Sequence, residues 1–134
     1  MAFVNEIITD MWVGARKQSD RVPCRDLSQV VNAIRKLDGD KYTEVILFGQ
    51  GRTLIIGGGN KGRYVVVLTV GQDEAFQTLL NATPAVGDDI PVVVGGQEGL
   101  YPANQVVDLS AALQSSESFF ESGEPAANMR WERS

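Results

Sequence analysis

Residues 53–70, TLIIGGGNKGRYVVVLTV, carry the strongest indication of the fold in this sequence. Two runs rich in valine, isoleucine, threonine and tyrosine, at 53–56 and 64–70, flank a connector of glycines with asparagine, lysine and arginine. The side chains of both runs suit a pleated, half-buried surface, and glycine and asparagine tolerate the positive φ that a chain reversal needs. The stretch therefore predicts a β-hairpin at the middle of a sheet.

The same glycines admit a second interpretation, a loop from Gly57 to Arg63 that cradles phosphate. Such loops follow a strand and open a helix, because the backbone N–H groups of a helix N-terminus bind the anion. The residues after this loop are strand-like, and its spacing matches neither GxGxxG nor GxxxxGK[ST]. We favour the hairpin, in which the glycines also permit close approach of another backbone. A small nucleotide-binding domain that uses this loop stays an alternative.

The composition bounds the class of protein. A chain of 134 residues, of which 43% are hydrophobic, fits one domain, 1–134, with a packed core. No run approaches the ~20 apolar residues of a membrane helix, and the first twelve residues lack the basic start of a signal peptide. The single cysteine, Cys24, excludes an internal disulfide and favours a reducing setting. We therefore expect a cytoplasmic protein without a membrane partner.

Histidine does not occur in the sequence, and this is the most restrictive fact in the composition. Histidine is the usual proton shuttle at neutral pH and the commonest nitrogen ligand of metals. Ser-His-Asp and Cys-His arrangements are therefore impossible, and so are the usual zinc sites. Carboxylate-pair chemistry remains open, but no feature selects a particular pair. We predict no enzyme activity, no catalytic residues, no metal and no cofactor.

The net charge of −5 hides an uneven distribution. Residues 1–63 are net basic, whereas residues 64–129 carry nine acidic side chains and no basic one. Such a segment repels nucleic acid, whose binders need cationic contacts to phosphate, and it attracts a basic partner. An acidic surface also serves solubility alone, so both interpretations stay open. The candidates for a partner-binding surface are Tyr101, as an aromatic anchor, and five carboxylates: Asp73, Glu74, Asp88, Asp89 and Glu98.

A first helix is predicted at 26–38. Asp26 is a suitable N-cap, and Gln29 stands three residues on, where a capping box needs Glu or Gln. Apolar residues then recur at the helical spacing and form one stripe: Leu27, Val30, Val31, Ile34 and Leu37. Gly39 can end the helix. We expect the stripe to lie on the sheet.

A second helix is predicted at 109–122, after a cap at Asp108 or Ser110. The end of the chain returns an aromatic residue, Trp131, to the fold. A tail that contains methionine and tryptophan is expected to pack rather than stay free, so we predict a final edge strand there. Both tryptophans, Trp12 and Trp131, are expected in the core because of the large area that an indole buries.

Strands are predicted, in chain order, at 3–12, 43–48, 53–56, 64–70 and 90–94. The last four are expected in one group that begins as an antiparallel meander. Irregular segments are predicted at 14–23, 81–89 and 95–102, and 73–80 is ambiguous between a short helix and a loop. The fold class is therefore α+β: a single domain with a mostly antiparallel β-sheet and two principal helices packed on it.

Several residue groups, taken in order, resemble a known family. They are LDG at 37–39, IGGG at 56–59, GRYV at 62–65, GGQ at 95–97 with Pro102 shortly after, FFESG at 119–123 and WE at 131–132. Their order and spacing between Arg25 and Glu132 are similar to those of immunity protein family one of bacterial polymorphic toxin systems. No catalytic residues are carried over by this resemblance, which agrees with the missing histidine.

The resemblance implies a small α+β protein, encoded beside a toxin gene, that binds and neutralises its cognate toxin in the producing cell. Toxins of the deaminase fold, which act on nucleic acid bases, often neighbour this family, so the implied partner is a basic toxin domain of that kind. Acidic side chains can cover the cationic surface that such a toxin must present and occlude its active site. A secretion chaperone or adaptor, which binds without inhibiting, is the alternative that an activity assay separates.

Overall fold

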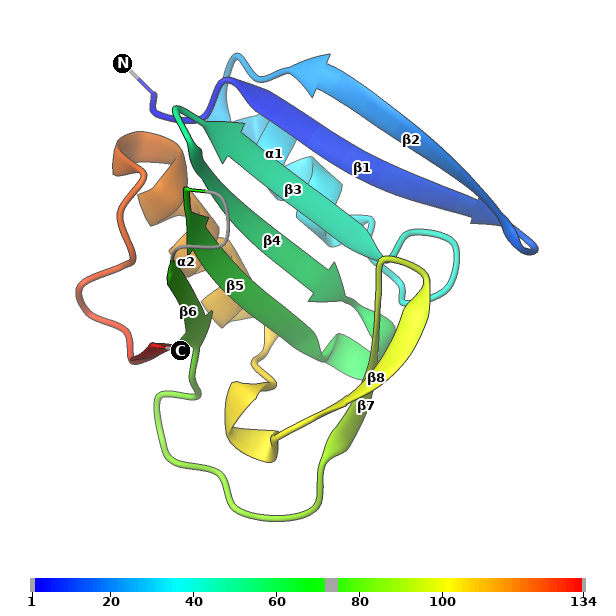
Figure 1. Cartoon of the computed structure of the whole chain (residues 1–134), viewed down its shortest axis with the longest axis vertical. Coiled ribbons are helices and arrows are strands. Elements are labelled where there is room, and N and C mark those ends of the chain that lie inside the picture. Colours follow the sequence, from blue (N-terminus) through cyan, green and yellow to red (C-terminus); the bar gives the residue numbers. More distant parts are fainter. Residues whose placement is uncertain (1, 72–74, 134) are drawn as a thin grey trace.

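The computed structural model describes residues 2–71 and 75–133, which form one α+β domain (Figure 1). The strands of its large sheet are β1 Glu6–Val13, β2 Arg16–Pro23, β3 Glu44–Gly49, β4 Arg52–Gly58, β5 Tyr64–Val70, β6 Ala75–Leu79 and β9 Trp131–Arg133. Their spatial order is β2-β1-β3-β4-β5-β6-β9, and every neighbouring pair is antiparallel. A separate hairpin pairs β7, Ile90–Val94, with β8, Gln97–Tyr101.

The predicted central hairpin is confirmed. β4 is the middle strand of the sheet and pairs with β5 along its whole length, from Arg52 opposite Val70 to Gly58 opposite Tyr64. The connector holds only η1, a three-residue 3-10 turn at Asn60–Gly62, and β5 follows it. The helix that a phosphate-binding loop requires is therefore not formed after these glycines.

Both helices are confirmed, α1 at Leu27–Arg35 and α2 at Leu109–Ser122. The capping box of α1 is complete, because Gln29 N–H donates to the Asp26 carboxylate and Asp26 N–H donates to the Gln29 side chain. α1 ends three residues before the predicted 38, since the N–H groups of Asp38 and Gly39 donate to the Tyr42 carbonyl.

The main core lies between the helices and the large sheet. Both helices cover the same face of that sheet (Figure 1), and α1 turns the fully buried side chain of Ile34 onto it. α2 contributes Phe119, whose ring meets Phe3 edge-on with centroids 5.5 Å apart. Trp131 packs against this cluster from the edge strand β9, as expected, whereas Trp12 is half-buried outside it.

The prediction of a loop at 14–23 is wrong, because residues 16–23 form strand β2. β2 is an edge strand whose side chains are exposed at every position except the half-buried Val22. Its sequence therefore lacks the apolar alternation by which a strand is recognised. Backbone pairing with β1 alone defines it, with Glu6 opposite Pro23 and Val13 opposite Arg16.

Three further predictions are corrected by strand pairing. Residues 75–79, expected as helix or loop, form β6 on the edge of β5. Part of the predicted irregular segment 95–102 forms β8, and β7 joins it rather than the group of 43–70. These strands have only five residues each, so partners distant in sequence decide their structure, not their own pattern.

Candidate functional site

Four of the six predicted partner-binding residues lie on or beside the β7–β8 hairpin. Asp88 and Asp89 are exposed in the segment that enters β7, and Glu98 and Tyr101 lie on β8. Asp73 and Glu74 lie outside the described residues. Tyr101 is opposite Ile90, the residue after Asp89, whereas Glu98 is opposite a position three residues further along β7, about 10 Å away. The structure therefore groups the two aspartates with Tyr101 and sets Glu98 apart.

The surroundings of Tyr101 and Glu98 differ. Tyr101 is half-buried against a second apolar cluster centred on Val65, Val92 and Val106. Glu98 is exposed and borders a small hollow together with Lys61 and Arg63. Glu98, which belongs to the acidic second half of the sequence, therefore lies beside two cations from the first half.

The hairpin is held on the large sheet by glycines of β4. A Cβ on Gly57 would lie 2.5 Å from both Cγ atoms of Val94, and a Cβ on Gly58 would lie 2.9 Å from Cγ1 of Val92. Side chains at these two positions would keep β7 off the sheet. A Cβ on Gly59 would lie 2.3 Å from the carbonyl oxygen of Leu37, which is the close backbone approach expected for this run.

The tip of the hairpin is fixed by a buried polar network. Gly96 N–H donates to the Thr43 hydroxyl oxygen over 2.9 Å, and that hydroxyl donates to Asp10. Asp10 is only 3% exposed, and its carboxylate also accepts from Thr43 N–H, Glu44 N–H and the Trp12 indole at 2.8–2.9 Å. Because the carboxylate is fully supplied with donors, the network positions the hairpin and leaves Asp10 little capacity for a ligand.

Glu44 stands beside this tip. Its Oε2 atom would lie 2.9 Å from a Cβ on Gly95. Burial raises the pKa of Glu44. The negative charge of Asp10 raises this pKa further, whereas the positive charge of Lys17 lowers it.

The face of the large sheet turned away from the helices carries two rows of cross-strand neighbours. Direct partners in antiparallel strands project to the same side, and Leu54 and Ile56 point to the helices, so Thr53 and Ile55 point away from them. The aliphatic row is Ile8, Ile46, Ile55 and Val67. The aromatic row is Phe48, Thr53, Thr69 and Phe76. We call these eight residues the open face.

The open face is more apolar than a solvated sheet face normally is. Phe48 and Phe76 are 38% and 36% exposed, and three half-buried isoleucines of the aliphatic row belong to neither apolar cluster. In Figure 1 the helices lie behind the sheet, and the β7–β8 hairpin crosses in front of it at one end. Apolar residues that adjoin one another and are partly open to solvent in this way mark interaction surfaces. The sequence predictions did not include these residues, although the runs at 53–56 and 64–70 lack the polar alternation of a solvated face.

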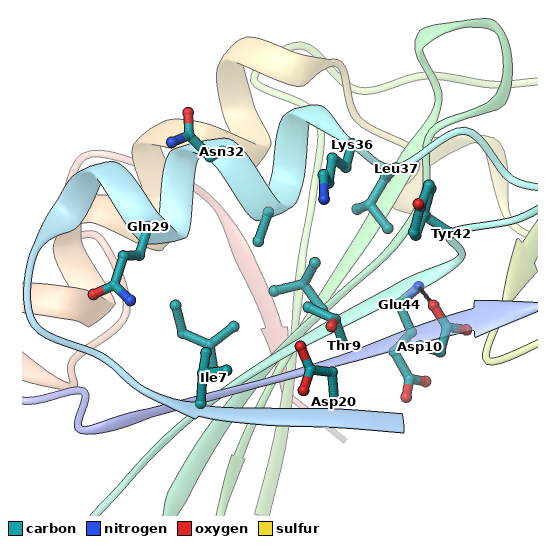
Figure 2. A pocket seen from close by; sticks show the side chains of 13 residues that line it. Ile7, Thr9, Asp10, Asp20, Gln29, Asn32, Lys36, Leu37, Tyr42 and Glu44 are labelled. Atoms are coloured by element: carbon teal, nitrogen blue, oxygen red, sulfur yellow. Dashed lines mark hydrogen bonds between the residues drawn. The ribbon is translucent and has the colours of Figure 1, made fainter. Parts of the chain in front are cut away.

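A cavity of about 300 Å³ lies between α1 and the strands β1 and β2. In Figure 2, Lys36 points into this cavity from α1, and Asp20 points into it from β2. Ile7 contributes to its apolar lining. The Lys36 ammonium also lies 5.5 Å from the centroid of the Tyr42 ring. Within residues 2–71 and 75–133, no cluster of His, Cys, Asp and Glu is arranged to hold a metal ion.

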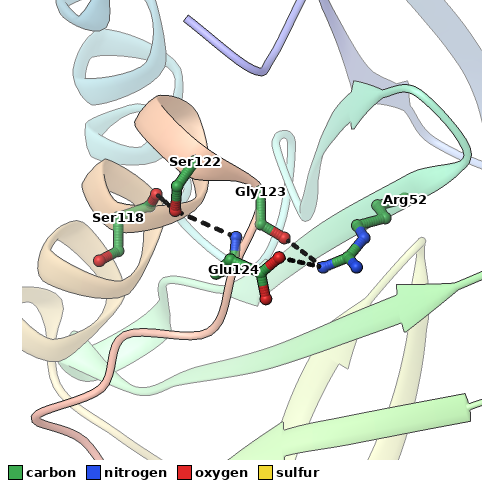
Figure 3. A network of polar contacts seen from close by, with 5 residues as sticks. All are labelled: Arg52, Ser118, Ser122, Gly123 and Glu124. Carbon is green, nitrogen blue, oxygen red and sulfur yellow. Dashed lines mark hydrogen bonds and ion pairs between the residues drawn. The ribbon is translucent and has the colours of Figure 1, made fainter.

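The ion pair at the end of α2 is structural. Arg52, at the start of β4, donates to the Gly123 carbonyl over 2.9 Å and pairs with Glu124 over 3.1 Å (Figure 3). Ser122 continues this network by accepting from Glu124 N–H and donating to the Ser118 carbonyl. These contacts join the helix layer to the sheet and offer no reactive group.

A protein-family model described as immunity protein Imm1 matches residues 18–133 of the chain. The chain belongs to the Imm1 family of immunity proteins. The matched region includes both helices, the β7–β8 hairpin and most strands of the open face. Membership of the Imm1 family indicates a toxin-neutralising immunity function and a cognate toxin as partner.

No curated protein matches the chain. Neither α1 nor α2, nor any other helix in the described part of the chain, has the length and apolar character needed to cross a membrane.

Proposed function

We propose that this Imm1 protein binds a cognate polymorphic toxin and neutralises it by occluding the toxin's active site. We further propose that the toxin has the deaminase fold and modifies nucleic acid bases, and that the protein acts in the cytoplasm of the producing cell without catalysis of its own. The observation that carries the proposal is the Imm1 match over residues 18–133. The nine acidic and zero basic residues at 64–129 support a cationic partner.

The proposed mechanism is electrostatic and steric. A toxin that acts on nucleic acid needs a cationic, concave surface to hold phosphates. Asp88 and Asp89 are exposed beside Tyr101 at one end of a hairpin whose other end is fixed by the Asp10 network. An exposed acidic segment beside an anchored hairpin can approach such a cleft quickly and then exclude the substrate. Asp73 and Glu74 remain in the proposed acidic surface by their charge and sequence position.

Co-expression tests this function. The toxin domain encoded beside this gene is produced in a susceptible bacterium with and without the full chain. We predict that growth stops with the toxin alone and is restored by the chain, while an unrelated immunity protein restores nothing. Growth arrest that persists although both proteins are made and form a complex would identify an adaptor instead of an inhibitor.

A further inference from the structure

We propose that the toxin docks on the open face of the large sheet and lies against the β7–β8 hairpin as a side wall. This inference rests on the proposed function and names the surface through which it acts. The open face consists of the aliphatic row and the aromatic row, which together span the strands from β1 to β6. With strands about 4.8 Å apart, it is about 20 Å wide.

The required contact area argues for the open face. A specific interface buries about 800 Å² and 20–30 residues on each partner. The outward side of the hairpin offers four side chains: Pro91, Val93, Glu98 and Leu100. The hairpin alone is therefore too small. A partner that binds the hairpin must therefore bury the rest of its contact area on a surface next to the hairpin.

The open face adjoins the hairpin directly. Val67, the last member of the aliphatic row, packs against the cluster that Val92 and the half-buried Tyr101 form beneath the hairpin. Asp88 and Asp89 lead into that hairpin at the Tyr101 end. The hairpin thus connects the predicted acidic segment to the open face.

The charges at the two ends of the aliphatic row and at the entry to β7 fit a cationic partner. Strand pairing continues the aliphatic row to Arg21 on β2 at one side and, through Thr78 on β6, to Glu132 on β9 at the other. The charge of Arg21 is compensated by Glu6, 3.4 Å away, whereas Glu132 and the two aspartates add negative charge. A groove that binds single-stranded nucleic acid combines cations with aromatic platforms on which bases stack. An apolar face with phenylalanines, and with negative charge at Glu132, Asp88 and Asp89, is the complement of such a groove, whereas Lys61 and Arg63 lie beside Glu98 on the outward side of the hairpin.

Thr53→Arg tests the docking surface, because it places a long cation in the middle of the aromatic row on a central strand. The probe is the catalytically inactive toxin domain encoded beside this gene. We expect binding to weaken by at least about 30-fold, the fold-change that corresponds to a hot spot, and protection in co-expression to fail. Gln114→Arg, which makes the same charge change on the exposed side of α2, is the matched control and should bind as the native chain does.

A second variant keeps the test decisive if arginine prevents folding. Phe48→Gln combined with Phe76→Gln removes two exposed aromatic rings and leaves the main core intact; thermal unfolding verifies that each variant is folded. If the folded open-face variants bind the toxin as tightly as the native chain does, the proposed docking surface is wrong. The immunity function still holds in that case, because the native chain binds the toxin and protects the cell. If the native chain neither binds nor protects, the proposed function fails, and the inference fails with it.

Discussion

The indole of Trp12 lies directly on the backbone of Gly96: a Cβ on Gly96 would lie 2.1 Å from Cζ2 of Trp12. Trp12 belongs to β1, and Gly96 lies in the turn between β7 and β8. The contact therefore joins the tip of the hairpin to a strand distant from it in sequence. Glycine is required here both by the lack of space and by a φ of +81°.

Gly96→Ala should release the hairpin tip. Gly51 has nearly the same φ, +77°, but nothing lies within 4 Å of a Cβ there, so Gly51→Ala reports the backbone strain alone. We expect Gly51→Ala to lower the free energy of unfolding by about 1 kcal/mol, and Gly96→Ala by about 1–3 kcal/mol more. Urea unfolding measures both, and hydrogen exchange should rise within 90–101 only in Gly96→Ala. Equal losses in the two variants would refute the contact.

Ile34→Ala tests whether α1 is anchored to the sheet. Ile34 is fully buried beneath α1, and deleting such a side chain creates a cavity, so the free energy of unfolding should fall by about 2–5 kcal/mol. Asn32→Ala, exposed on the same helix, should change it by less than about 0.5 kcal/mol. A loss below about 0.5 kcal/mol for Ile34→Ala would show that this stripe does not face the core.

Glu44 should make stability depend on pH. Burial raises its pKa in the folded state, so the folded protein holds this proton more tightly than the unfolded chain. The resulting stabilisation is present below the unfolded pKa and is lost as the pH rises through the folded pKa. Glu44→Gln should therefore be more stable than the native chain at about pH 7.5, and this advantage should shrink towards about pH 4.

Denaturant unfolding at the two pH values measures this difference. Glu117→Gln, which removes an exposed carboxylate on α2, controls for the change in net charge. If Glu44→Gln is more stable than the native chain by the same free energy at both pH values, burial does not destabilise the ionised carboxylate of Glu44.

The elements that could be predicted from the sequence are those whose own residues carry the signal. α1 has a capping box and an apolar stripe, and β4 and β5 have β-branched runs joined by glycines. β2 and β8 have no such signal, because exposed or glycine-containing strands form through backbone bonds to a partner. For these strands the partner had to be known first.

The candidate surface was predictable only in part. The charge count points to Asp88 and Asp89, which the structure places beside Tyr101. It does not reveal that Glu98 lies beside Lys61 and Arg63, because those cations come from the other half of the chain. The open face depends on strand register, which aligns Phe48 with Phe76 across β4 and β5. Register is a property of paired strands, so the sequence of a single strand does not reveal it.

Reversal of two charges tests the acidic segment. Asp88→Lys with Asp89→Lys changes exposed loop residues, so the fold should persist while association with the cognate toxin slows. Added salt should slow association of the native chain clearly, because exposed charges are screened within about 8–10 Å at 0.1–0.15 M ionic strength. Surface-based kinetics across a salt series measures both effects. An unchanged rate with the original salt slope in the lysine variant would show that these aspartates do not steer the toxin.

Titration of toxin activity shows whether this chain inhibits its toxin by binding it. The purified toxin domain encoded beside this gene is assayed on single-stranded nucleic acid while the chain is added stepwise. We predict that base modification falls in proportion to the added chain and stops at one chain per toxin. A complex of the two proteins that retains the full activity of the free toxin would show that binding does not inhibit the toxin.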